Sequence, residues 1–200
     1  LPILLPMFAG SLLLLGAGLS LRVKRSLSLL ATLLLLPLSG YLLWLADQGV
    51  LQVYAAGNWA APFGIILLLD RLSALLLVVT AVLGSFALLY AVRGDDERGQ
   101  SFHALFQFQL MGINGAFLTG DLFNLFVFFE ILLIASYALL VHGGGAERVR
   151  AGLHYVVLNL VGSAFFLLAV GVLYGITGTL NMADMAIRVA AAGPDDAALL

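Results

Sequence analysis

The sequence predicts an all-α membrane protein, a polytopic bundle of transmembrane helices, and its composition supplies two of the three supporting observations. Of its 200 residues, 62% are hydrophobic and only 10% are charged. Its mean hydropathy is +1.11. Because a water-soluble domain carries about a quarter of its residues as charged side chains, so few charges cannot cover the outside of a soluble globule. They are enough to cover the loops of a helix bundle whose flanks face lipid.

The third observation is the spacing of the apolar residues. A helix needs about 20 mostly apolar residues to cross the hydrocarbon layer. Six stretches have about this length or more, and they are residues 1–21, 26–46, 65–92, 102–119, 122–141 and 151–175. We therefore expect six spans in a single membrane domain over residues 1–200. After them, residues 182–192 predict a short helix that Asn181 caps, that Gly193-Pro194 ends, and that lies at the membrane surface.

The basic residues predict the orientation of these spans. Seven of the nine fall in the first, third and fifth connections, and they are Arg22, Lys24, Arg25, Arg93, Arg98, Arg148 and Arg150. Loops rich in lysine and arginine stay on the cytoplasmic side. The pattern therefore places the N-terminus outside, and the fifth span runs from the outside towards the cytoplasm.

Glu130 is the main candidate functional residue, because it lies near the middle of the fifth span. A charge at the centre of a membrane helix costs about 2.5–3.5 kcal/mol on insertion scales, and such residues are usually kept for a function. A carboxylate at this depth suits a proton relay. The alternative is a structural group that hydrogen-bonds a neighbouring helix.

Other polar side chains extend this hypothesis. Tyr137 lies about 10 Å nearer the cytoplasm on the same helix face and serves either a proton relay or core packing. His154, in the first turn of the sixth span, either collects cytoplasmic protons or is an interfacial residue without special duty. Further polar residues of the fourth and sixth spans fall near the depth of Glu130, where they either hold water or join helices. They are Gln107, Gln109, Asn114, Asn159 and Ser163.

Several functions find no support in the sequence. It has no cysteine and no phosphate loop, nucleophile elbow or paired-histidine zinc motif, so we expect no cofactor, no metal and no soluble-type catalysis. It also has no basic patch for nucleic acid. Residues 94–99 are expected to be a solvated charged loop, and His103 is expected to have no special role.

Three segments carry a resemblance to a known family. They are GDLFNLFVFFEILLIASYALL at 120–140, DRLSAL at 70–75 and LYGITGTLNMAD at 173–184. They resemble the D subunit of the multi-subunit Mrp-type sodium/proton antiporter, and the resemblance covers essentially the whole chain.

The resemblance implies a proton-translocating subunit, related to the antiporter-like subunits of respiratory complex I, in the inner (plasma) membrane of a prokaryote. Inward proton movement would drive sodium or another monovalent cation outward, within a hetero-oligomer of antiporter subunits. The family fold contains two inverted five-helix repeats, in which a glutamate on the fifth helix, here Glu130, works with a lysine on a broken seventh helix. This sequence stops before that helix, and its only lysine is Lys24, so we expect an N-terminal fragment. Many relatives carry lysine where His154 stands.

Two alternatives stay open at this point. One is a proton-pumping membrane subunit of a complex I-like NADH dehydrogenase or of a membrane hydrogenase, since the proton machinery would be much the same. The other is a scaffold subunit that translocates nothing and in which Glu130 is structural.

Overall fold

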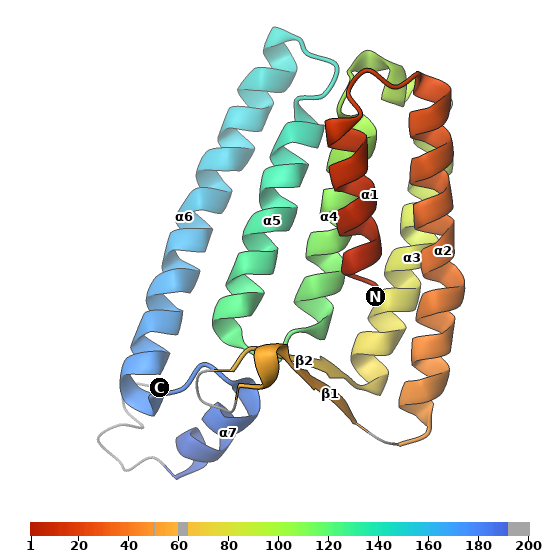
Figure 1. Ribbon diagram of the computed structural model, residues 1–200. Helices are drawn as coiled ribbons and strands as arrows, with labels where there is room; N and C mark the ends of the chain where they lie inside the picture. Colours follow the sequence, from red (N-terminus) through yellow and green to blue (C-terminus); the bar gives the residue numbers. More distant parts are fainter. Residues whose placement is uncertain (50, 60–63, 192–200) are drawn as a thin grey trace.

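The computed structural model describes residues 1–49, 51–59 and 64–191. Six helices stand side by side and run alternately up and down (Figure 1). Their bounds are Leu4–Leu15 (α1), Leu21–Asp47 (α2), Arg71–Ala91 (α3), Phe102–Leu118 (α4), Leu122–Leu140 (α5) and Ala146–Thr177 (α6). The α1–α2, α3–α4 and α5–α6 connections share one end, at the top of Figure 1. We call it the basic end, because its loops and the adjoining helix turns carry the seven basic residues.

Four of these helices are long and apolar enough to cross a membrane, namely α2, α3, α5 and α6. The prediction of one helix over residues 1–21 is wrong, because α1 has only 12 residues and ends at Leu15. At 1.5 Å per residue such a helix is about 18 Å long, less than the hydrocarbon layer. The chain then turns through Gly16 to Ser20, and α2 begins at Leu21.

The structure is mostly helical, as predicted, but the opposite end carries a two-stranded antiparallel sheet that the sequence analysis did not predict. Strand β1 (Gln52–Ala55) pairs with β2 (Ile66–Leu69), with Gln52 opposite Leu69, and the short 3₁₀ turn Ala56–Asn58 follows β1. A single span over 65–92 is therefore also wrong. Asp70 separates β2 from α3: its carboxylate accepts a hydrogen bond from the Ser73 backbone N–H, and Ser73 Oγ accepts one from Asp70 N–H. This capping box starts α3 inside the predicted span, at the one place where charged residues, Asp70 and Arg71, interrupt its apolar pattern.

Backbone hydrogen bonds hold this end, which we call the hairpin end, together. Gly120 N–H donates to Ile66 O of β2, and Leu122 N–H donates to Leu180 O, both at 2.9 Å. Helix α7 (Met182–Ala190) starts from the same junction, because Asn181 Oδ1 accepts hydrogen bonds from Ala183 and Asp184 N–H. The N-terminus of α5 is thus tied to the sheet and to the α6–α7 turn. The predicted end of the short helix, at residues 192–194, lies outside the described residues.

The packing is densest among α1 to α4 and thins towards α6. One apolar cluster joins α2, β2, α3 and α4 through residues Ala46, Leu69, Ala74, Leu77 and Leu118. In the most apolar 18-residue segment of each helix, 39% of the segment is buried inside the protein in α3 and only 6% in α6. Two glycines let α4 approach α5: a Cβ on Gly112 would meet Leu132, and one on Gly115 would meet the Phe128 ring.

Gly112→Ala is expected to destabilise the bundle, because the new Cβ would lie 2.7–3.0 Å from the Cβ, N and Cα atoms of Leu132. Backbone atoms cannot rotate away, so α4 and α5 must separate, at a cost of about 1–3 kcal/mol. Gly40→Ala in α2 is the matched control, since nothing lies within 4 Å of its Cβ position. Thermal unfolding of the complete protein in detergent should show a lower midpoint for the first variant only. Equal midpoints would contradict this account of the α4–α5 contact.

Candidate functional site

Glu130 lies halfway along α5 on the side that faces α6. Its carboxylate Oε1 accepts a hydrogen bond from the Ser163 hydroxyl of α6, and both residues are half-buried. Helices α5 and α6 are antiparallel neighbours, so a residue that precedes Glu130 in α5 contacts a residue that follows Ser163 in α6. Phe126 therefore stacks on Phe166 at a centroid distance of 6.1 Å. The carboxylate is thus held between two helices and has a polar neighbour.

A pocket of about 270 Å³ opens beside this hydrogen bond. It is lined by Phe126, Phe129, Leu133, Leu158, Asn159, Gly162, Ser163 and Phe166. One water takes up about 30 Å³ of liquid volume, so the pocket has room for several. Ser163 belongs both to the pocket and to the carboxylate pair. The pocket therefore lies next to the carboxylate, and Ser163 and Asn159 are the polar side chains of its otherwise apolar lining.

Tyr137 lies two turns nearer the basic end. Its ring meets Tyr155 of α6 edge to face, with centroids 5.7 Å apart. Its hydroxyl is buried and has no hydrogen-bond partner among the described residues. Since buried hydroxyls are normally paired with protein or ordered water, this oxygen is a natural position for a water molecule.

The other predicted site residues lie in different surroundings. His154 is exposed, and its Nδ1 is 2.9 Å from Arg150 O on its own helix. It stands about 13 Å from Ser163 along the axis of α6. Asn159 lines the pocket, but its amide donates to Tyr155 O, one turn earlier.

Two polar residues of α4 face away from Glu130 and into the α1–α4 bundle. The Asn114 amide donates to Pro2 O at 2.9 Å. The Gln107 amide donates to the hydroxyls of Ser28 and Thr32 in α2. Both residues join helices here and are not next to the carboxylate. Gln109 is half-buried, and its Oε1 has no partner in the described part of the chain.

The sequence reasoning missed a group of charged and titratable residues at the basic end, three of them buried, which we call the Asp96 cluster. It comprises Lys24, Arg25, Asp96, Glu97 and His103. Asp96, in the 3₁₀ turn Asp95–Arg98, is 1% exposed and accepts hydrogen bonds from Arg25 Nε and Nη2 at 2.6 and 2.7 Å. His103 Nε2 lies 3.0 Å from Asp96 Oδ2. The prediction of a solvated loop is therefore wrong for Asp96, because side chains from α2 and α4 enclose it.

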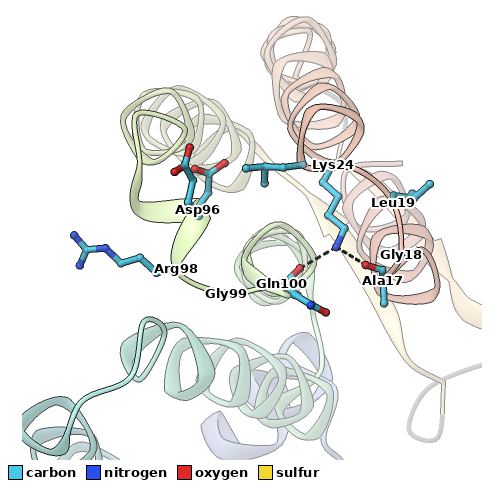
Figure 2. Close-up of a pocket in the computed structure, with 10 residues that line it drawn as sticks. Ala17, Gly18, Leu19, Lys24, Asp96, Arg98, Gly99 and Gln100 are labelled. Carbon is cyan, nitrogen blue, oxygen red and sulfur yellow. Dashed lines mark hydrogen bonds between the residues drawn. The ribbon is translucent and has the colours of Figure 1, made fainter.

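Electrostatics in this cluster follow from the pairing. The Arg25 guanidinium, assisted by His103, holds the pKa of Asp96 below its usual range despite burial. Lys24 is 5% exposed, and its ammonium donates to Ala17 O and Gln100 O, at 2.8 and 3.3 Å, across a cavity of about 710 Å³ (Figure 2). In the sequence, this cluster is visible only as carboxylates near one loop and basic residues near another. Such a pattern does not predict whether the charged side chains are buried.

Comparison with known proteins gives consistent matches. The family of membrane segments of NADH:quinone oxidoreductases and Mrp antiporters matches residues 119–195. The D subunit of a probable K⁺/H⁺ antiporter of Rhizobium meliloti is 50% identical over 97% of this chain. The D subunit of a Na⁺/H⁺ antiporter of Bacillus subtilis is 42% identical over 96%. The chain is related to the D subunits of the Mrp-type antiporters. It spans 37% and 39% of the lengths of these two relatives.

Solved structures show the same antiporter-like fold. A chain of the archaeal membrane-bound sulfane sulfur reductase complex superposes with a TM-score of 0.91 at 31% identity, over 98% of this chain and 41% of its own. A chain of the Mrp complex from Dietzia superposes with a TM-score of 0.83 at 28% identity, over 94% and 38%. The resemblance to Mrp-type D subunits inferred from residues 120–140 is therefore confirmed. The fold is shared between antiporter and respiratory complexes.

Proposed function

We propose that this chain is part of a proton-translocating membrane subunit of a monovalent cation/proton antiporter, with Glu130 as its mid-membrane proton relay. The observation that carries the proposal is the pairing of a carboxylate in the middle of α5 with Ser163 of α6, beside a pocket large enough for water. The relation to the Mrp-type D subunits supports the same conclusion. The protein would be a secondary transporter and not an enzyme.

The proposed proton path follows the α5–α6 interface. Water in the pocket would reach Ser163 and Glu130, and the Tyr137 hydroxyl, which has no partner in the part of the chain that the structure describes, would continue the path towards the basic end. His154 stands beyond it on the exposed face of α6 and would collect protons there. Asn159 supplies a second polar group to the pocket wall.

We further propose that α2 to α6 cross the inner membrane of a prokaryote and that the shorter α1 enters it alongside them, with the start of α1 towards the outer side and the basic end in the cytoplasm. The grouping of seven of nine basic residues at that end supports this orientation. The exposed apolar faces of α5 and α6 would contact lipid or other members of a hetero-oligomer. Helix α7 would lie along the outer membrane surface.

We propose sodium as the cation that is exchanged for protons. The names of the two relatives include potassium in one case and sodium in the other. A second candidate function is a proton-pumping subunit of a respiratory complex, because the chain from the sulfane sulfur reductase complex superposes so closely.

Inverted membrane vesicles that contain the complete protein in its complex test the proposal. After respiration acidifies the interior, added NaCl or KCl is expected to dissipate the pH gradient, as followed by an acridine dye. Vesicles without the complex are the control. Equal responses from both vesicle types with either cation would reject the antiporter. A gradient that the complex generates from electron transfer alone would favour the respiratory pump.

A further inference from the structure

Two buried polar side chains lie about one helical turn apart on α4, away from Glu130. His103 Nδ1 and Gln107 Oε1 are both buried and have no hydrogen-bond partner among the residues described. The two residues are four positions apart, so their Cβ atoms stand about 5–6 Å from each other on one helix face. Because buried polar atoms are normally satisfied, the pair needs an explanation.

The partners of His103 determine where its hydrogen lies. Its Nε2 is 3.0 Å from Asp96 Oδ2, and an ionised carboxylate only accepts hydrogen bonds. The bidentate Arg25 contact keeps Asp96 ionised. Nε2 therefore carries the hydrogen, and Nδ1 of the neutral ring presents a lone pair.

The partners of Gln107 determine its amide orientation in the same way. Its Nε2 is 3.2 Å from Ser28 O, a carbonyl that can only accept. The amide nitrogen must point there, and Oε1 is left on the other side as an acceptor. Two acceptors cannot bond each other, but one water has two O–H donors and can serve both.

We propose that His103 and Asp96, with a single water held between His103 and Gln107, form a second proton-binding site in the α1–α4 bundle. The extra proton binds at His103 Nδ1 and comes from solvent through the bound water. The water then turns: it accepts from Nδ1–H and still donates one hydrogen to Gln107 Oε1. His103 Nδ1 and Gln107 Oε1 therefore each keep a partner in both protonation states, and only the second hydrogen of the water changes its surroundings when the site is loaded.

Asp96 is the charge that favours a proton on His103, because its carboxylate lies 3.0 Å from His103 Nε2. Within the cluster, Asp96 and Glu97 carry two negative charges, and Arg25 and Lys24 carry two positive ones. Lys24 opposes the proton from the neighbouring turn of α2, but its ammonium is held by two backbone carbonyls. Helix α1 has no ionisable side chain, and the ionisable residues of α3, Arg71 and Tyr90, lie away from the site or are exposed.

A cavity at the basic end borders Asp96, the hydrogen-bond partner of His103, whereas His103 and Gln107 are not among its lining residues. The cavity in Figure 2 is lined by Lys24 and Asp96 together with Glu97, Arg98 and Gln100. If that end faces the cytoplasm, as proposed above, the site senses cytoplasmic pH. The inference rests on the proposed function for this role, whereas the bound water does not depend on it.

A high-resolution cryo-EM map of the complete complex tests the water directly. We expect a density peak within about 3.2 Å of both His103 Nδ1 and Gln107 Oε1. The peak should disappear in Gln107→Met, which has similar length and no amide. A wild-type map without this peak would overturn the proposal, whether or not the complex exchanges cations.

The pH dependence of exchange tests the titration. His103→Gln can still donate to Asp96 but cannot bind a proton, so the pH midpoint of exchange should shift measurably from that of the wild type. His142→Gln, at the same end and in contact with Asp95 O, is the matched control and should keep the wild-type profile. Gln107→Met should also displace the midpoint. Profiles that coincide for all three variants and the wild type would overturn the second site and leave the antiporter proposal intact.

Discussion

Glu130→Gln is expected to abolish cation/proton exchange while the complex still assembles. Glutamine has the size of glutamate, and its amide oxygen can accept the hydrogen bond from the Ser163 hydroxyl that Glu130 accepts. The α5–α6 contact therefore survives, and only the ability to bind and release a proton is lost. The measurement is the cation-induced collapse of the pH gradient in vesicles, with the amount of assembled complex determined in the same preparation.

Three further variants sharpen this test. Glu130→Asp keeps the proton-binding group and should retain part of the activity. Ser163→Ala removes the hydrogen-bond partner and should reduce exchange less than Glu130→Gln does. Glu147→Gln, at the exposed start of α6, controls for the loss of a carboxylate and should leave exchange unchanged. Wild-type exchange by an assembled Glu130→Gln complex would show that the carboxylate is structural.

Asp96→Asn is expected to destabilise the basic end, by about 2–3 kcal/mol, since breaking a buried pair costs up to about 3–5 kcal/mol. The change removes the charge that binds Arg25 and His103 and leaves their donors with one weaker acceptor. Arg25 is partly exposed, with 27% of its side chain accessible, which lowers the expected cost. Glu97→Gln is the matched control, because Glu97 binds the same guanidinium at 3.0 Å but its side chain is 61% exposed. Exposed pairs contribute about 0–1 kcal/mol.

The pH dependence of this effect has a definite sign. Since the pKa of Asp96 is lower in the folded protein, its stabilising contribution is fully present above the unfolded pKa of about 3.9. The contribution is lost as pH falls through the folded pKa. Unfolding midpoints of wild type and Asp96→Asn should therefore differ at neutral pH and converge below about pH 4. A difference that stays constant well below that pH would contradict the role assigned to the carboxylate.

Sequence reasoning succeeded where one dominant physical effect acts. The long apolar stretches predict helices because the backbone must satisfy its own hydrogen bonds in lipid. Glu130 stands out because a charge in such a stretch is costly, and Ser163 was among the polar residues expected near its depth. The sequence analysis did not predict the strands at Gln52–Ala55 and Ile66–Leu69. The second strand is apolar and leads directly into the apolar helix α3, so the composition is the same on both sides of the boundary. Only the Asp70 cap marks where the helix begins.

The sequence by itself determined the class of protein, the end that gathers basic charge and the residue most worth testing. Only the tertiary structure decided which polar residues meet. Asn114 and Gln107 lie at nearly the same depth in the membrane as Glu130, but their side chains point away from it. Asn114 binds Pro2 just before α1, and Gln107 binds α2. The direction of a side chain depends on how the helices pack around it. Asp96 and Arg25 are 71 residues apart, and their burial follows from the pairing of α2 with the α3–α4 turn. Hydropathy measures single residues, whereas burial of a charge depends on partners that folding brings from distant parts of the chain.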